Sequence, residues 1–148
     1  MKNSATALIT YNKKILMLLR DNKPEIPDPN CWQLIGGQLE SNETPIEALI
    51  REVREESNLE IKKNEPILIG EINFLGKKKI FLYWIKLSKE KAREVKLGNE
   101  GQEIAFFSIK ELEKLNLGLN TSNYFKKFKK GLKNIVENEV MDKKALGF

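Results

Sequence analysis

The run Ile15-Leu16-Met17-Leu18-Leu19 limits the folds open to this chain more than any other feature of the sequence. A strand with one wet face alternates apolar and polar residues, so an unbroken apolar run indicates a strand that is covered on both faces. Helices on the two sides of a sheet provide such cover. The chain has 148 residues, the length of one ordinary domain. We therefore predict a single α/β (α+β) domain over residues 1–148.

Other patterns divide the chain into further strands, helices and loops. Apolar runs bounded by turn residues predict strands at 5–11, 14–19, 32–35, 66–75, 79–87 and 104–107. Helices are predicted at 44–57, from a capping box at Ser108 to a stop at Gly118, and at 122–137. Residues 21–30 carry three prolines and residues 88–100 are charged, so both are predicted loops. The tail from Glu139 is expected to fray.

The helix predicted at 44–57 has the clearest boundaries. Thr44 and Glu47 fit a capping box, with Pro45 at the first helical position. Asn58 stands where a left-handed residue ends a helix. Apolar residues at helical spacing form one stripe for a sheet to cover: Ile46, Leu49, Ile50 and Val53.

Composition excludes several kinds of chemistry. Histidine is absent and Cys31 is the single cysteine, so imidazole bases, Ser-His-Asp triads, cysteine clusters and internal disulfides are excluded. Carboxylates, Lys, Tyr, hydroxyls and hard metals remain. The net charge of +5 suits an anionic ligand or nucleic acid, and by itself decides little. The sequence shows no signal peptide or apolar membrane span, so we expect a cytoplasmic protein.

Three glutamates lie together on the predicted helix. Glu52, Glu55 and Glu56 fall within an arc of roughly 100° on the helical wheel. Like charges at this spacing repel, whereas a hard cation such as Mg²⁺ binds carboxylate oxygens. Gly36 and Gly37 precede the helix and let the backbone approach a ligand. A metal site and an ordinary solvated acidic face both remain open on this pattern alone.

The wider spacing around these glutamates is far more specific. The segment reads Gly37-x5-Glu43-x7-Arg51-Glu52-Val53-x-Glu55-Glu56-x-Asn58-Leu59 and resembles the Nudix box, with Asn58 in place of its last glycine. At ~6% per fixed residue, such a match arises by chance in on the order of one window in ten million. Ile35 also stands where many relatives have proline. The resemblance implies an α/β/α sandwich with a central mixed sheet.

The same resemblance implies a Nudix hydrolase, in which water attacks a phosphorus of a nucleoside diphosphate derivative. Mg²⁺, or Mn²⁺ in its place, would be held by Glu52, Glu55, Glu56 and the carbonyl of Gly36. One of these glutamates would also help to deprotonate the water. Glu43 and Arg51 would form an ion pair that braces the loop against the helix.

Residues outside the box resemble those of Nudix relatives that cleave nucleoside triphosphates, including oxidised ones. Glu100 matches a loop glutamate that joins the metal site or acts as base, and Glu103 is the second choice; an exposed acidic turn is the alternative. Arg20 is suited to a substrate phosphate, or to plain surface charge. Asn120 resembles a base-binding residue, or ordinary turn chemistry.

We therefore predict a Mg²⁺-dependent nucleotide pyrophosphatase with a small-molecule nucleotide as partner. Two alternatives remain: a Nudix-fold module that binds a nucleotide or ADP-ribose without cleaving it, and a hydrolase of dinucleoside polyphosphates or RNA 5′ ends. The basic last helix is attributed to a solvated face, so nucleic-acid binding is not favoured. The sequence leaves the general base, the number of metals and the choice between monomer and homodimer open.

Overall fold

Strand β1 (Ser4–Tyr11) organises the sheet of the computed structural model, which describes residues 2–74 and 76–148. β1 runs parallel to β6 (Lys78–Lys86) along most of its length. Its start pairs antiparallel with β4 (Ile35–Gln38), and its end pairs antiparallel with β2 (Lys14–Leu19). β5 (Ile67–Phe74) extends the sheet beyond β6. On the other side, β2 pairs with both β3 (Trp32–Gln33) and β7 (Glu103–Phe107).

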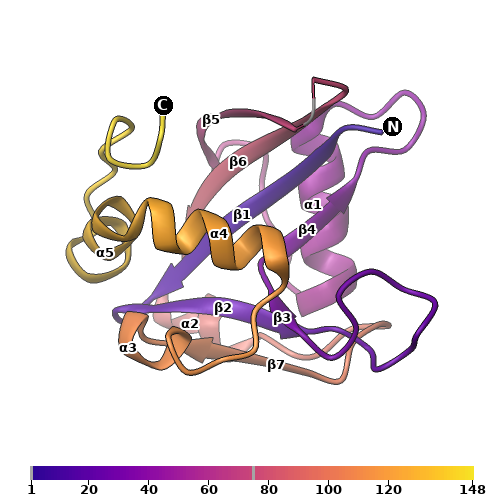
Figure 1. Cartoon of the computed structure of the whole chain (residues 1–148), viewed down its shortest axis with the longest axis horizontal. Coiled ribbons are helices and arrows are strands. Elements are labelled where there is room, and N and C mark those ends of the chain that lie inside the picture. The colour runs from indigo at the N-terminus through magenta and orange to yellow at the C-terminus, as the bar shows by residue number, and fades with distance from the viewer. Residues whose placement is uncertain (1, 75) are drawn as a thin grey trace.

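The sheet is mixed, as predicted, and helices cover both of its faces. Figure 1 shows α1 (Pro45–Ser57) behind the sheet and α4 (Leu119–Lys127) in front of it, with α5 (Lys129–Asn138) beside α4. Side chains of β2 alternate between the two sides. Leu16 and Leu18 join the core cluster under α1, whereas Ile15 and Met17 join the cluster under α4 and α5. The apolar run of β2 is therefore buried on both faces.

The signals at the ends of α1 act as the sequence predicts. Thr44 and Glu47 make the reciprocal hydrogen bonds of a capping box, and Asn58 ends the helix in the left-handed conformation at φ 64°. The buried face differs from the predicted stripe. Ala48 is fully buried and Ile50 only partly, and Glu56 is buried as well. Glu56 therefore faces the sheet and Glu52 is partly buried, whereas Glu55 stays exposed to solvent.

Several sequence predictions of element type or boundary are wrong. Gly36 and Gly37 do not follow a strand but lie inside β4, after a break at Leu34. The charged segment 88–100 contains a short helix, α2 (Lys89–Arg93), which the Ser88 side chain caps. The helix opened by Ser108, α3 (Ile109–Leu112), has its capping box but ends well before Gly118. Gly118 instead stands at the start of α4.

The last predicted helix is two helices, divided at Phe128, where φ is −114° and ψ is 34°. The apolar spacing continues across the break, because Phe125 and Leu132 both reach the same core cluster, and so the pattern gave no sign of it. The tail expected to fray is packed. Leu146 is fully buried, and its carbonyl accepts a hydrogen bond of 2.8 Å from the Tyr124 hydroxyl.

The predicted strand 66–75 is present as β5, although Leu75 lies outside the described residues. Within the two described ranges, no helix is both long and apolar enough to cross a membrane.

Candidate active site

Two glutamates of α1 lie against the two glycines of β4. The Gly36 amide donates a hydrogen bond of 2.9 Å to Oε1 of Glu56. A Cβ on Gly37 would lie 2.5 Å from the carboxylate of Glu52, and a Cβ on Gly36 would lie 2.4 Å from the Ala5 carbonyl oxygen. The missing side chain of Gly37 therefore leaves room for the Glu52 carboxylate of α1, and that of Gly36 lets β4 lie close to β1.

The backbone of Gly36 is turned towards these carboxylates. The amide of Leu39 bonds to the carbonyl of Asn3, and neighbouring pairs in an antiparallel ladder alternate between bonded and unbonded. Gly36 faces Thr6 in an unbonded position, so its amide and carbonyl both point away from β1. The amide reaches Glu56, and the carbonyl oxygen, directed away from β1, is placed to bind a ligand.

Arg51 holds the chain before α1 and the glutamates on α1 together. Its Nε and Nη2 atoms donate to the two carboxylate oxygens of Glu43 at 2.7 and 2.9 Å. Nη2 also reaches the Gln38 carbonyl at 3.0 Å, and Nη1 reaches Glu52 at 2.9 Å and Glu55 at 3.3 Å. Arg51 and Glu43 thus form the expected ion pair, and it is bidentate. The same guanidinium also binds Glu52 and Glu55 of the acidic cluster.

Burial makes negative charge costly at the centre of the site. Glu56 is only 8% exposed, and its burial raises its pKa to about 8. The nearby carboxylates of Glu52 and Glu100 act in the same direction, whereas the Gly36 hydrogen bond and the charge of Arg20 oppose it. Burial also raises the pKa of Glu52, against the influence of Arg51. A cation placed here would stabilise both ionised carboxylates.

The loop that follows α2 brings Glu100 to this cluster. The amides of Gly98 and Asn99 bond to the carbonyls of Glu56 and Glu55, at 3.1 and 3.2 Å. A Cβ on Gly98 would lie 1.7 Å from the Glu55 carbonyl oxygen, so no other residue fits this approach. The sequence predicted a loop over residues 88–100 but gave no signal for the place of Gly98 against α1.

On the far side of Glu100, the chain is held by β2, where the Gln102 amide bonds to the Leu19 carbonyl at 2.8 Å. The loop is therefore anchored before and after Glu100.

A cleft of about 220 Å³ opens beside the carboxylates, and Arg20, Glu56 and Glu100 all line it. Arg20 Nη1 donates to Oε1 of Gln33 at 3.2 Å, and its Nε is buried without a hydrogen-bond partner among the described residues. The cleft also includes Lys23, from the proline-rich loop 21–30. Sequence reasoning predicted a loop of functional length there, but could not say which of its residues reach the cleft.

Two candidates lie away from this cleft. Asn120 is in the first turn of α4 and exposed, not in the loop before the helix as predicted. Glu103 is the exposed first residue of β7, where it pairs with Leu19. Neither residue lines the cleft. Of the two loop glutamates, the structure thus brings Glu100 to the cluster.

The donor set fits a hard divalent cation that also has ligands outside the protein. In the part of the chain that the structure describes, no three acidic, cysteine or histidine side chains converge on one point. The reason is visible in the contacts: Arg51 draws Glu52 and Glu55, while Glu56 bonds to Gly36. Mg²⁺ commonly takes one or two carboxylates together with water and substrate phosphate oxygens, which this arrangement allows.

A family model and two related proteins agree on the family that this chain resembles. A family model described as NUDIX domain matches residues 1–128. The chain is 38% identical over 69 residues to dihydroneopterin triphosphate diphosphatase of Haemophilus influenzae, covering 45% of this chain and 40% of that protein. It is 29% identical over 108 residues to ADP-ribose pyrophosphatase of Methanocaldococcus jannaschii, covering 73% of this chain and 62% of that protein. The matches thus span less than two thirds of either relative.

The fold is also found among solved structures. A NUDIX hydrolase from Nitrosomonas europaea superposes with a TM-score of 0.71 at 19% identity, covering 95% of this chain and 73% of that one. At this identity, the likeness supports the fold and not the activity.

Proposed function

Because the chain belongs to the NUDIX family, as the match over residues 1–128 shows, we propose that it is a divalent-metal-dependent hydrolase of a nucleoside diphosphate derivative. The proposed reaction converts a nucleoside triphosphate, oxidised or not, to the monophosphate and pyrophosphate. The observation that carries the proposal is the cleft itself. Glu56 is fixed on the Gly36 amide, Glu52 lies over Gly37, and Glu100 and Arg20 line the same opening.

The residues that would hold Mg²⁺ or Mn²⁺ are Glu52, Glu55, Glu56, Glu100 and the carbonyl of Gly36. The metal, when bound, neutralises the diphosphate and stabilises negative charge on the leaving oxygen. Arg51 contributes by orienting the carboxylates of Glu52 and Glu55 through Nη1.

Two further tasks of the reaction, deprotonation of the water and binding of a phosphate oxygen, can be carried out by side chains of the cleft. The attacking water forms a bond to phosphorus while the bridging phosphorus–oxygen bond breaks, and the water proton passes to a carboxylate. We assign this base role to Glu100, because Glu100 is exposed on the cleft whereas Glu56 already accepts the Gly36 amide. Arg20, whose Nε has no hydrogen-bond partner within the described ranges, is suited to hold a phosphate oxygen.

The charge of the cleft favours a triphosphate. Arg20 lines it without a carboxylate partner among the described residues, and Lys23 lines it 4.0 Å from the carboxylate of Asp21. Arg20 is therefore the cation available for a phosphate oxygen beyond the cleaved bond, and Lys23 can add a second contact by leaving Asp21. The names of the two relatives, a dihydroneopterin triphosphate diphosphatase and an ADP-ribose pyrophosphatase, define a test of this preference. A diphosphate-linked substrate would use fewer of these positive charges.

A hydrolysis panel tests the proposal. Nucleoside triphosphates, 8-oxo-dGTP, dihydroneopterin triphosphate and ADP-ribose are incubated with protein and Mg²⁺ or Mn²⁺, and released pyrophosphate or phosphate is measured. We expect activity on triphosphates that chelation abolishes. Glu56→Gln should lower kcat by at least about 10²-fold, as loss of an electrostatic catalytic group does, whereas the exposed control Glu60→Gln should leave it unchanged.

Two results would count against the proposal. A fully active Glu56→Gln protein would refute the site. Tight nucleotide binding by calorimetry, with no turnover of any substrate in either metal, would instead identify a binding module.

A further inference from the structure

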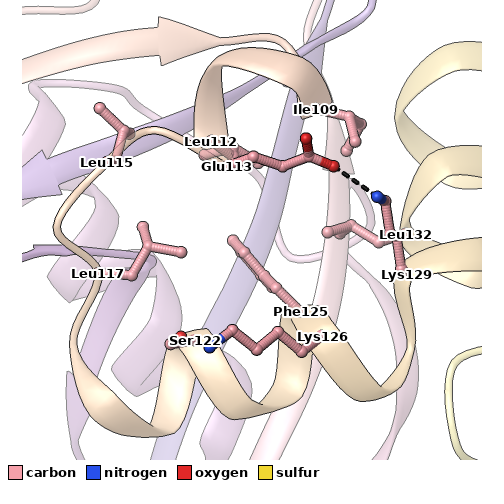
Figure 2. A pocket seen from close by; sticks show the side chains of 10 residues that line it. All are labelled: Ile109, Leu112, Glu113, Leu115, Leu117, Ser122, Phe125, Lys126, Lys129 and Leu132. Carbon is pink, nitrogen blue, oxygen red and sulfur yellow. Dashed lines mark ion pairs between the residues drawn. The ribbon is translucent and has the colours of Figure 1, made fainter.

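A second cavity, of about 390 Å³, lies between α3, α4 and the start of α5. Its walls are six apolar side chains, several of which Figure 2 shows pointing into the opening: Ile109, Leu112, Leu115, Leu117, Phe125 and Leu132. Four of these belong to the core cluster on the face opposite α1. None of the residues that line this cavity lines the carboxylate cleft. The cavity is therefore separate from the proposed active site.

Hydrogen bonds to β3 position one wall of the cavity. The Trp32 amide bonds to the Asn116 carbonyl at 2.8 Å, and the Gly118 amide bonds to the Trp32 carbonyl at 3.0 Å. These two bonds tie the chain on both sides of Leu117, one of the apolar walls, to the edge of the sheet. The apolar walls favour an apolar guest, and the volume lies within the usual range for small-molecule sites.

The rim of the cavity is charged and has a surplus of positive charge. Glu113 forms an ion pair with Lys129 across one edge, drawn in Figure 2. Lys126 also lines the cavity, and Figure 2 shows its chain extending towards Ser122. Lys126 makes no ion pair within residues 2–74 and 76–148. One lysine at the mouth is thus left to bind an anion.

We propose that this cavity is a ligand site for a small monoanion with an aromatic body. The aromatic part would lie on the apolar walls against the Phe125 ring, and the anionic group would bind Lys126 at the rim. The apolar walls would thus bind the aromatic part of the ligand, and the lysine at the rim would bind its anionic group. The proposal does not depend on hydrolase activity, because it uses no residue of the carboxylate cleft.

A matched pair of fluorescent probes tests both halves of this claim. 1-Anilinonaphthalene-8-sulfonate carries the ring system and one negative charge, and N-phenyl-1-naphthylamine carries the same rings without the charge. Each is titrated into the full chain without metal. We expect saturable binding of the sulfonate with a dissociation constant below about 1 mM, and about tenfold weaker binding of the neutral probe, as for loss of one charged hydrogen bond.

Three variants locate the binding. Lys126→Glu should weaken the sulfonate about tenfold and leave the neutral probe unchanged. Ser122→Trp, at the rim, should block both probes by filling the opening. The control Lys130→Glu changes the same charge at an exposed position that does not line the cavity, and should leave both affinities unchanged.

Each alternative outcome overturns a stated part of the proposal. Absence of saturable sulfonate binding refutes the site. Binding that survives Ser122→Trp in a folded variant places the probe elsewhere. Equal affinity for the two probes, or equal effects of Lys126→Glu and Lys130→Glu, refutes anion recognition by Lys126. Since metal-free binding is measured, none of these results depends on whether the protein hydrolyses nucleotides.

Discussion

The buried carboxylate of Glu56 should make the metal-free protein less stable as pH rises. Its pKa is about 8 in the folded protein against an ordinary 4.5, so between these values the folded state keeps a proton that the unfolded chain has released. Each pH unit in this window then lowers the free energy of unfolding by up to about 1.4 kcal/mol, approaching ~5 kcal/mol in total. Above pH 8 this contribution is constant.

Glu56→Gln isolates the effect, because the amide oxygen of Gln can still accept the Gly36 hydrogen bond but the side chain cannot ionise. Unfolding free energies are measured by urea denaturation, with EDTA present, at several pH values from 5 to 9. We expect the variant to gain stability relative to the native chain as pH rises, by several kcal/mol over this range. The exposed control Glu60→Gln should show no such trend. A difference between native chain and variant that stays constant with pH would refute the burial argument.

Three further substitutions test the supports of the site. Arg51→Lys removes the bidentate contact with Glu43, so the melting temperature should fall by about 3–6 °C in thermal unfolding. Gly37→Ala places a Cβ against the carboxylate of Glu52, so calorimetry should show Mn²⁺ affinity reduced about tenfold or more. Gly98→Ala pushes its loop away from the end of α1, so kcat should fall about tenfold or more while the protein stays folded.

A glycine in open space provides the control for the last two. Gly76 has no atom within 4 Å of an added Cβ, but its φ of 68° strains any side chain there, so Gly76→Ala should lower stability and leave metal affinity and kcat unchanged. If Gly37→Ala or Gly98→Ala behaves like Gly76→Ala, the close approach of that glycine to α1 has no role at the site. For Arg51→Lys, an unchanged melting temperature would show that a single lysine contact stabilises the protein as well as the bidentate contact of Arg51 with Glu43.

The sequence predicted those helix ends that are fixed by hydrogen bonds between residues close together in the chain. The capping box at Thr44 and the left-handed Asn58 fixed both ends of α1, because each acts on backbone groups within a few residues. The same is true of Ser108 at the start of α3. The division at Phe128 escaped prediction, because the apolar spacing on either side serves one core and does not change at the break.

The site divides in the same way. The box spacing predicted the family, which the match over residues 1–128 confirms, and the resemblance to that family implied the pairing of Glu43 with Arg51, which the structure contains. These are properties of a motif in one segment, and the metal-binding role of its glutamates stays a prediction. Only the tertiary structure decided that Glu56 is buried on Gly36, that Gly98 brings Glu100 to the cluster, and that Asn120 stays outside the cleft. Each of these depends on contacts between segments that are 20 or more positions apart, whose distance in space is set by the packing of α1 and the loops on the sheet.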